Sequence, residues 1–485
     1  MAFDVETGIS NWIGKSDMKI KRGPFRVLLW VGILFLFYSQ SAAGAVSNDE
    51  LLKRLNNLNT TIQKQQQEIQ ELKQVLKKHS ESIDKARKEQ KEEIKKAVKV
   101  ETKEAEKTWR DSLPKWTRKI RISGDLRLRY ERLWDRGMLN ENGTPGKQDD
   151  RDRGRVRVRL YMDVPITDEI KTHFMITTNM ATHQEATTTN ATFGEDFNDK
   201  GIFLARAYAE YKPNRFKGLG VGAGKFKKNF YNTDIMWDTD VNPDGAFEYY
   251  RYQGSKVFQP FIYLGQMVVN ENNRTPDAML YLNQAGFTWN VGPVKWEFAG
   301  SYYSWSNLNG TKWMHDGAYN KGGGNSFITD PATGNIDYEY GYKLWEAYSQ
   351  IGFKLGPYPA IVYLDYIYNA ADGVPSDENK AYNFSFKIGD EAKKGAYSFY
   401  YKYAYIEQNA VLGCLNDQDF YGANRKGHKV ALHYWPYGNT LLRAVFFYTD
   451  PVSNWKTASE GNSLWNSDRY KEHENRLQMD VVLKF

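Results

Sequence analysis

The chain has 485 residues, 15% of them aromatic, and a formal net charge of +7 that is modest for this length. Its mean hydropathy of −0.68 is that of a polar protein. A soluble domain would bury so many rings in continuous apolar segments, whereas a membrane β-barrel carries apolar residues at every second position and keeps its average hydropathy low. Because the charge is small, a nucleic-acid partner is not indicated. The single cysteine, Cys414, excludes an internal disulfide.

Residues 1–45 have the features of a secretory signal peptide. Basic residues at positions 19, 21, 22 and 26 precede an apolar run over 27–38, and small residues lead to the A-x-A site Ala43-Gly44-Ala45. We predict cleavage after Ala45, and Met18 as the true start because residues 1–17 add a polar stretch that such a signal does not need. The alternative is an uncleaved anchor, but a run of about a dozen apolar residues is short for a span of roughly 20.

Residues 46–115 are predicted to form a periplasmic coiled coil and a linker. Between 51 and 90, apolar residues recur in alternating steps of four and three beneath a charged, Gln-rich exterior, which favours a coiled coil over a single solvated helix. Homotypic association is implied, although the mixture of Leu and Ile does not settle the number of strands in the coil. The seam consists of Leu51, Leu55, Leu58, Ile62, Gln65, Ile69, Leu72, Leu76, His79, Ile83, Ala86 and Gln90.

Residues 116–485 are predicted to form an all-β, transmembrane antiparallel β-barrel of about sixteen strands. In the segment 119–131 every even position is apolar or Gly and every odd one is polar, and 155–164 repeats this period of two. Such strands have the length that a tilted membrane strand needs. The candidate strands lie at about 119–131, 155–164, 169–181, 201–213, 217–228, 244–253, 256–269, 278–291, 293–305, 341–355, 358–370, 381–390, 393–409, 426–436, 438–450 and 474–485.

The predicted connections alternate in length, as short periplasmic turns and longer extracellular loops do in these barrels. An even number of strands also returns both barrel ends to the periplasmic side, where the coiled coil must lie. Tight connections fall at 165–169, 292–293, 356–359, 390–395 and 436–439, and long ones at 132–152, 182–200, 229–243, 306–340, 410–425 and 451–473. Trp134, Trp237, Trp289, Trp305, Trp345 and Trp435 lie near strand ends and suggest an interfacial girdle.

The inward positions of the first strands are basic. A charge facing lipid would cost roughly 2–4 kcal/mol near the midplane, so these side chains are predicted to line the pore. Arginine on one wall biases a pore toward anions. The alternative is a wall that pairs with Asp125, Glu131, Asp163 and Glu210 and only keeps the lumen wet. The predicted pore-lining residues are Lys119, Arg121, Arg127, Arg129, Arg155, Arg157, Arg159 and Arg206.

No metal site, cofactor or catalytic residue is predicted. The segment 238–245 resembles the opening of a calcium loop, but Pro243 replaces the required Gly and Tyr249 the bidentate acid, so a folded or constricting loop is favoured. The histidines show no ligand spacing, and no nucleophile–base spacing is evident. An enzyme is therefore not expected.

Several segments resemble one family. They are 120–131, which opens the first strand, 224–230 with 237–245, Lys394-Gly395 leading into 401–407 and 417–420, and the closing strand. Over 116–485 the chain is similar to the putative porins of Gram-negative outer membranes. The resemblance implies a trimeric diffusion channel in outer-membrane lipid. In the closing strand, Val481, Leu483 and Phe485 are predicted to be the signal for the barrel-assembly machinery.

The sequence thus predicts an outer-membrane porin that lets small hydrophilic solutes or ions diffuse passively along an arginine-rich wall. The alternative is a structural envelope anchor, whose coiled coil tethers the barrel to peptidoglycan or a periplasmic partner. In that case the long loops, particularly 306–340, would fold inward and close the lumen.

Overall fold

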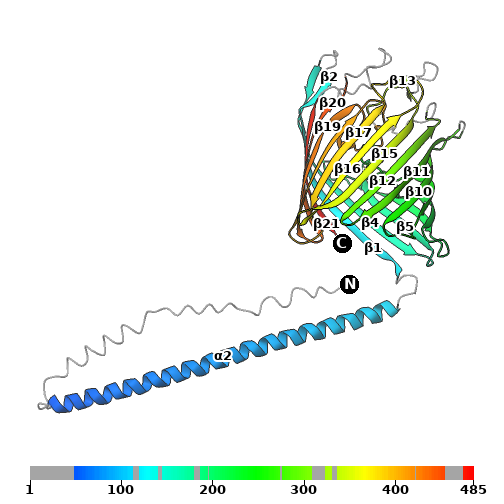
Figure 1. The fold of residues 1–485 in the computed structure, drawn as a ribbon. Coiled ribbons are helices and arrows are strands. Elements are labelled where there is room, and N and C mark those ends of the chain that lie inside the picture. The colour runs from blue at the N-terminus through cyan, green and yellow to red at the C-terminus, as the bar shows by residue number, and fades with distance from the viewer. Residues whose placement is uncertain are drawn as a thin grey trace. The chain divides into compact units, whose positions relative to one another are not determined.

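The computed structural model describes residues 48–112, 119–139, 145–179, 186–194, 196–273, 276–308, 323–329, 336–420, 422–453 and 473–485. They form two separate units, a helix and a barrel (Figure 1). The predicted signal peptide and its cleavage site lie outside the described residues.

The first unit is one long helix, α2 (Asn48–Ser112), of 65 residues. Asp49 and Glu50 lie in its first turn, where carboxylates favour a helix N-terminus. The helix covers the predicted coil and continues through the Lys/Glu-rich stretch after it. Its heptad residues Leu55, Leu58 and Leu72 are exposed, so the coil itself stays a prediction. Within the part of the chain that the structure describes, no helix is both long and apolar enough for a membrane crossing.

The second unit is a closed antiparallel barrel built from alternating apolar and polar strands. Sixteen strands of the described chain pair in sequence order, and β21 closes the wall by pairing with β1 from Asp125↔Lys484 to Trp134↔Asn475. The prediction of an all-β barrel of about sixteen strands is confirmed. The barrel strands are β1 (Arg121–Trp134), β4 (Arg151–Pro165), β5 (Ile170–Asn179), β7 (Gly201–Tyr211), β8 (Leu219–Lys225), β9 (Asp244–Arg251), β10 (Phe258–Asn270), β11 (Ala278–Val291), β12 (Val294–Ser306), β15 (Lys343–Leu355), β16 (Tyr358–Asn369), β17 (Lys380–Gly389), β18 (Ala396–Ile406), β19 (Arg425–Tyr437), β20 (Thr440–Pro451) and β21 (Glu474–Lys484).

Shorter elements decorate the connections. Two small hairpins pair β2 with β3 and β13 with β14, and β6 adds two residues beside β4. A single 3₁₀ turn, η2, lies between β18 and β19. These elements are β2 (Arg136–Leu139), β3 (Pro145–Gln148), β6 (Ala191–Thr192), β13 (Phe327–Thr329), β14 (Ile336–Tyr338) and η2 (Gln418–Phe420).

The connections alternate between short turns and long loops, as predicted. Gly292 and Gly356 begin two-residue turns and have φ of +57° and +60°, a conformation that glycine adopts without strain. Both barrel ends meet at the short-turn end: the Gly124 N–H donates to the Phe485 carbonyl at 2.9 Å, and the Phe485 N–H to the Gly124 carbonyl at 3.1 Å.

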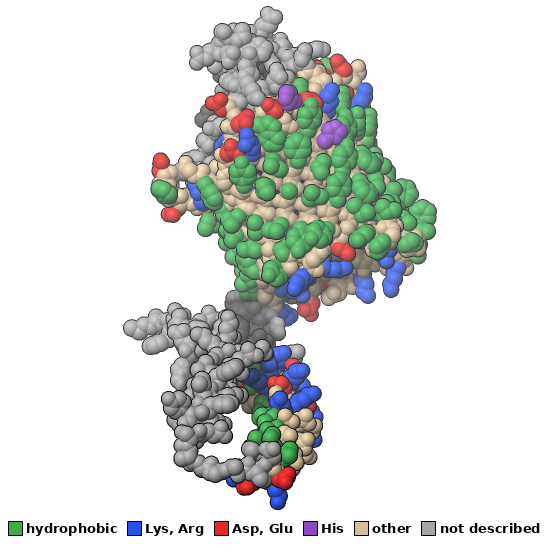
Figure 2. Space-filling view, turned by 90° about the vertical axis from the view of Figure 1, so that its left-hand side faces the viewer, with side chains coloured by type: hydrophobic (Ala, Val, Ile, Leu, Met, Phe, Trp, Pro, Cys, Tyr) green, Lys and Arg blue, Asp and Glu red, His purple; other side chains and the backbone are tan. Residues whose placement is uncertain are grey.

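On the face that Figure 2 shows, apolar side chains cover the outside of the barrel in a broad band, with charged side chains above and below it. On β1, Leu128 and Tyr130 are exposed while Arg127 and Arg129 are buried, which is the alternation that a wall between lipid and a polar interior requires.

The predicted tryptophan girdle is correct only in part. Trp289 and Trp345 are exposed, whereas Trp237, Trp305 and Trp435 are buried. Trp305 and Trp435 occupy buried positions of their strands' alternation, and Trp237 lies in a loop that stacks on Trp305. The alternation of the strand, and not nearness to its end, therefore decides where each ring points.

Candidate functional site

The loop between β8 and β9, residues 226–243, folds into the barrel; we call it the inner loop. It contacts strands on most sides of the wall, so it must cross the interior. This is the folded, constricting loop predicted from 238–245. Its contacts are Tyr231 Oη to Glu297 Oε1 on β12 at 2.8 Å, Thr233 Oγ1 to Asp365 Oδ2 on β16 at 2.5 Å, Asp234 Oδ1 to Lys402 Nζ on β18 at 2.9 Å, Asp240 Oδ1 to Arg159 Nη1 on β4 at 3.5 Å, and Asn242 Oδ1 to Arg206 Nε on β7 at 2.6 Å.

One side of the inner loop is apolar and packs on the wall. The contact is aromatic: Phe230 lies 5.4 Å from Tyr263 and Trp237 lies 6.2 Å from Trp305 between ring centroids. Together they form one buried cluster, which fixes the loop by burial as well as by polar contacts. The cluster includes Phe226, Phe230, Ile235, Met236, Trp237 and Val241 of the loop and Phe247, Tyr263, Leu280, Leu282, Tyr303 and Trp305 of the strands.

The inner loop is also held by charge. Burial alone would raise the pKa of Asp234, but the ammonium groups of Lys402 and Lys429 outweigh it and hold that pKa below its usual value. Lys228 donates to the backbone carbonyl of Val241 at 2.8 Å and also to that of Asp238. Its burial lowers the pKa of Lys228 to about 8.

Two further segments fill the loop end of the interior. In the β18–β19 connection, the Asp417 N–H donates to the Asp234 carbonyl at 2.9 Å, and Asp417 Oδ2 pairs with Lys429 Nζ at 2.9 Å. Residues 323–329 pack on that connection, where Asn325 Nδ2 donates to the Gln408 carbonyl at 2.7 Å. Residues 323–329 of the predicted loop 306–340 therefore pack on the β18–β19 connection, and closure of the lumen by this loop stays a prediction.

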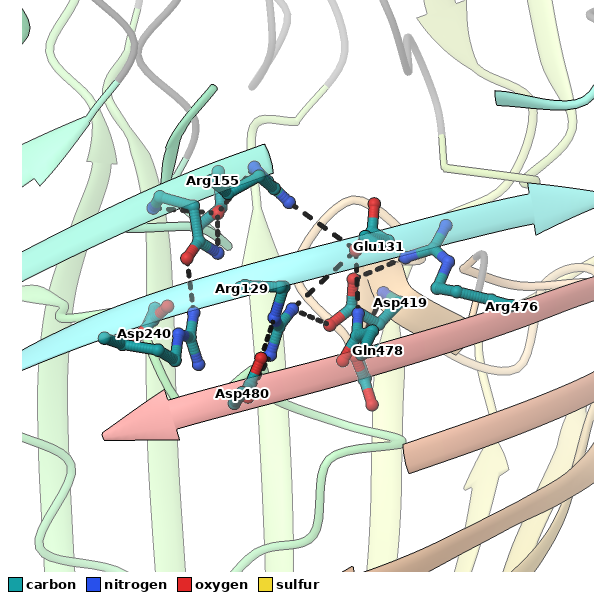
Figure 3. A network of polar contacts seen from close by, with 12 residues as sticks. Arg129, Glu131, Arg155, Asp240, Asp419, Arg476, Gln478 and Asp480 are labelled. Carbon is teal, nitrogen blue, oxygen red and sulfur yellow. Dashed lines mark hydrogen bonds and ion pairs between the residues drawn. The ribbon is translucent and has the colours of Figure 1, made fainter. Parts of the chain in front are cut away.

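The inner face of β1, β4, β20 and β21 is a basic surface, which we call the arginine wall (Figure 3). It contains Arg127, Arg129, Arg153, Arg155, Arg157, Arg159, Arg443 and Arg476. Among the residues that the structure describes, five carboxylates contact it, namely Asp125, Glu131, Asp240, Asp419 and Asp480.

The geometry of these pairs is tight. Asp480 accepts from Arg129 at 2.7 Å (Nε to Oδ1) and from Arg443 at 2.9 Å (Nε to Oδ2). Asp125 accepts from both Arg157 and Arg159, with Nη2 of each 2.8 Å from a carboxylate oxygen. Burying an isolated guanidinium is costly, and the attraction and hydrogen bonds within these pairs offset that cost.

The wall nevertheless has more arginines than carboxylates. Three of the arginine side chains also keep contact with solvent, with exposed fractions of 17% for Arg153, 22% for Arg159 and 26% for Arg443. Positive charge thus borders the part of the interior that the inner loop leaves to water.

The structure brings most of the predicted basic residues together. Arg127, Arg129, Arg155, Arg157 and Arg159 are all in the arginine wall, and the first four are buried. Arg206 lies beside the wall, because its Cζ and that of Arg159 are each 5.8 Å from the centroid of the Tyr161 ring, and it bonds to the inner loop.

Lys119 and Arg121 are not in this group. Both are exposed at the short-turn end of the barrel, where Lys119 Nζ lies 3.6 Å from Asp168 Oδ1. The predicted pairing of Asp163 and Glu210 with the wall is wrong, because they pair with His173 at 2.7 Å (Oδ1 to Nδ1) and Lys212 at 2.8 Å (Oε2 to Nζ).

Several site residues were missed by the sequence analysis. Arg443, Arg476 and Asp480 lie on alternating positions of the last two strands, so the period of two could have identified them. Asp240 and Asp419 come from loops, and no local pattern marks them. The terminal residues Val481, Leu483 and Phe485 are exposed, as members of an outward-facing set.

At the short-turn end, a cavity of about 680 Å³ opens beneath the inner loop; we call it the vestibule. It is lined by β1, β4, β5, β7, β9, β10, β11 and the first residues of the inner loop. Its lining residues are Ser123, Tyr161, Asp163, His173, Phe174, Arg206, Tyr208, Glu210, Lys212, Lys227, Asn229, Tyr249, Arg251, Phe261, Ile262, Tyr263 and Gln284.

Comparison with solved structures finds outer-membrane porins. OprB of Pseudomonas putida is 11% identical, with 76% of this chain and 96% of that chain covered at a TM-score of 0.47. OmpF of Salmonella typhi in complex with daunomycin is 11% identical, with coverage of 76% and 97% and a TM-score of 0.42. OmpT of Vibrio cholerae is 13% identical, with coverage of 76% and 99% and a TM-score of 0.41.

No curated protein matches the chain. A family model described as putative porin matches residues 59–331, which is more than half of the sequence. This finding confirms the resemblance identified from the strand motifs. The chain therefore belongs to the putative porin family of outer-membrane channels.

Proposed function

We propose that the barrel is a passive diffusion channel for small hydrophilic solutes and ions, and that the arginine wall gives it a preference for anions. The observation that carries this proposal is the excess of guanidinium groups over carboxylates on the wall that faces the inner loop. Fixed positive charge beside a narrow aqueous path lowers the energy of an anion there and raises that of a cation.

The partly exposed arginines support this preference most directly. Arg159 and Arg443 retain solvent contact, so a passing anion meets them without first breaking the fully buried pairs. Within a Debye length of about 8 Å at physiological ionic strength, their field remains effective. A wall whose charges cancelled would keep the lumen wet and leave selectivity to size alone.

The test is current recording from the purified protein in planar lipid bilayers under a KCl gradient. Wild-type protein should conduct with a reversal potential on the anion-selective side. Arg159→Gln combined with Arg443→Gln should shift the reversal potential toward cation selectivity. Lys343 is exposed on the outer face of β15, so Lys343→Gln should leave the reversal potential unchanged. Folded protein that is silent contradicts the channel, and an unchanged potential in the double variant contradicts the anion preference.

A second function is supported by the helix. At 1.5 Å per residue, α2 is roughly 100 Å long, and its heptad stripe is exposed. We propose that the stripe forms a coiled coil with copies of the same chain, giving a trimer, and that the coil lies in the periplasm and contacts peptidoglycan or a periplasmic protein. Deleting residues 46–113 separates the functions: lost envelope integrity with intact solute uptake indicates a tether.

The closing strand supports a further role in biogenesis. Val481, Leu483 and Phe485 are exposed on the barrel, accessible to another protein. We propose that these three side chains are the segment that the barrel-assembly machinery binds.

A further inference from the structure

The vestibule combines positive charge with aromatic surface. Four cationic side chains line it: Lys212, which pairs with Glu210, and three from different elements, namely Arg206 on β7, Lys227 in the inner loop and Arg251 on β9. Among the described residues, no carboxylate lies within ion-pair distance of any of the three. Their charge is therefore available to a solute.

The acidic residues of the vestibule are already engaged. Glu210 Oε2 lies 2.8 Å from Lys212 Nζ, and Glu210 Oε1 accepts from Tyr249 Oη at 2.9 Å. Asp163 Oδ1 lies 2.7 Å from His173 Nδ1. The ammonium group of Lys212 offsets the charge of Glu210, so Arg206, Lys227 and Arg251 outnumber the one carboxylate of the lining, Asp163, that no lysine or arginine pairs with.

Aromatic rings form much of the remaining lining. Arg251 Cζ lies 4.5 Å from the centroid of Phe261, and Arg206 Cζ lies 5.8 Å from that of Tyr161. Tyr208 stacks on the His173 ring at 4.7 Å between centroids. Each guanidinium is thus held beside a ring face, which orients its N–H groups without consuming its charge.

Arg251 is held firmly in this arrangement. Its Nη1 donates to Thr288 Oγ1 at 3.1 Å and its Nη2 to Tyr231 Oη at 3.4 Å, while Tyr231 belongs to the inner loop. A side chain fixed by neutral partners keeps unused donors for a carboxylate, and less of its conformational entropy is lost on binding.

We propose that the vestibule binds small organic anions in which a carboxylate stands beside an aromatic ring. The cations Arg206, Lys227 and Arg251 bind the carboxylate of the solute, and the rings of Tyr161, Tyr208 and Phe261 pack against its aromatic ring. The volume of about 680 Å³ is within the range of sites that enclose a small molecule. The inference rests on the proposed channel for access to the site, since solutes reach it through the lumen.

Isothermal titration calorimetry on the full chain in detergent tests this inference with benzoate as the probe. Acetate supplies the charge without the ring, and benzyl alcohol the ring without the charge. Benzoate should bind at least about tenfold more tightly than either, since each lacks one of the two interactions. If benzoate and acetate bind with the same affinity, the proposal is refuted.

Substitutions of vestibule residues test whether benzoate binds at this site. Lys227→Gln should weaken benzoate binding about tenfold, as the loss of one charge-assisted contact predicts; this side chain is exposed in the vestibule, so folding is not at risk. Arg251→Gln should do the same, and Lys343→Gln should not. Unchanged affinity in both vestibule variants refutes the site. Benzoate binding by a silent barrel upholds the site and refutes the channel, and conductance without benzoate binding does the reverse.

Discussion

At the scale of single residues, Gly124 is where the barrel closure leaves no room for a side chain. A Cβ there would lie 2.5 Å from the Arg159 carbonyl oxygen and 2.5 Å from Cζ of Phe485. Since Gly124 also exchanges two backbone hydrogen bonds with Phe485, any displacement disturbs the point where the last residue meets the first strand. The terminal ring therefore depends on a glycine 361 positions earlier in the chain.

We predict that Gly124→Ala destabilises the folded barrel by about 1–3 kcal/mol, the usual cost of forcing an extra methyl into a packed site. This loss of stability is measured as a decrease in the temperature at which the folded form is lost on heating in detergent. Gly300→Ala is the matched control, because a Cβ on that strand glycine meets nothing within 4 Å. If the two variants unfold at the same temperature, the proposed crowding at Gly124 is refuted.

Residue alternation predicted the basic wall and two of its partners, Asp125 and Glu131, but it missed the partners that come from loops. Arg127, Arg129 and Arg157 follow the period of two on adjacent strands, so their common face was readable from the sequence. Asp419, which accepts from Arg129 at 3.3 Å (Nη1 to Oδ2), comes from a connection 290 residues away. A charge on a loop has no period, so nothing local could indicate that it would meet the wall.

At the scale of elements, the inner loop is held by an ion cluster between distant strands. Asp234 lies 168 residues from Lys402 and 195 from Lys429, and Lys402 has no exposed side-chain surface. The strands were predictable because each one displays its own alternation. The inward folding of the loops was not, because it depends on contacts of this sequence separation.

We predict that Asp234→Asn loosens the inner loop. Removing one partner of a buried ion pair costs about 3–5 kcal/mol, because it leaves the other charge uncompensated. Cys414, the only cysteine, is buried in the neighbouring connection, where the Asp238 N–H donates to the Leu415 carbonyl at 2.7 Å. A faster reaction of Cys414 with a thiol reagent therefore reports the loosening. Asp244→Asn, which removes a more exposed pair with Lys225, should leave the rate unchanged.

The ion pairs of Asp234 also make the stability of the inner loop depend on pH. Because the pKa of Asp234 is held below its usual value in the folded protein, its stabilising contribution is fully present above about pH 4, the ordinary range of an aspartate. It is lost as the pH falls below that value. With a thiol reagent that reacts in acid, Cys414 of the wild type should stay protected from pH 7 to pH 4 and become reactive below. Asp234→Asn should have lost this acid transition, and a transition above pH 5 in the wild type would contradict the assignment.

At the scale of the whole molecule, two sequence periods predicted two units. The step of 3.5 residues corresponds to α2 and the step of 2 to the barrel, and the even number of strands returns both barrel ends to the short-turn end. The function divides in the same way. In the functions that we propose, the barrel carries solutes along a basic wall, while the exposed stripe of α2, with Leu58 and Leu72, joins one chain to another.

Replacing seam residues of α2 tests this association in the full chain. Leu58→Lys with Leu72→Lys would place four extra charges per pair of helices in the seam, so the proposed trimer should dissociate at a lower temperature or a higher dilution. Leu52→Lys with Val75→Lys is the matched control: both side chains are apolar and exposed, but neither lies in the heptad seam. The mass of the detergent-solubilised assembly, followed by light scattering, is the measurement. A wild-type protein of monomeric mass, or equal behaviour of the two double variants, contradicts a coiled coil. If the seam variant dissociates while the channel current of the barrel persists, the helix governs assembly and the barrel alone governs transport.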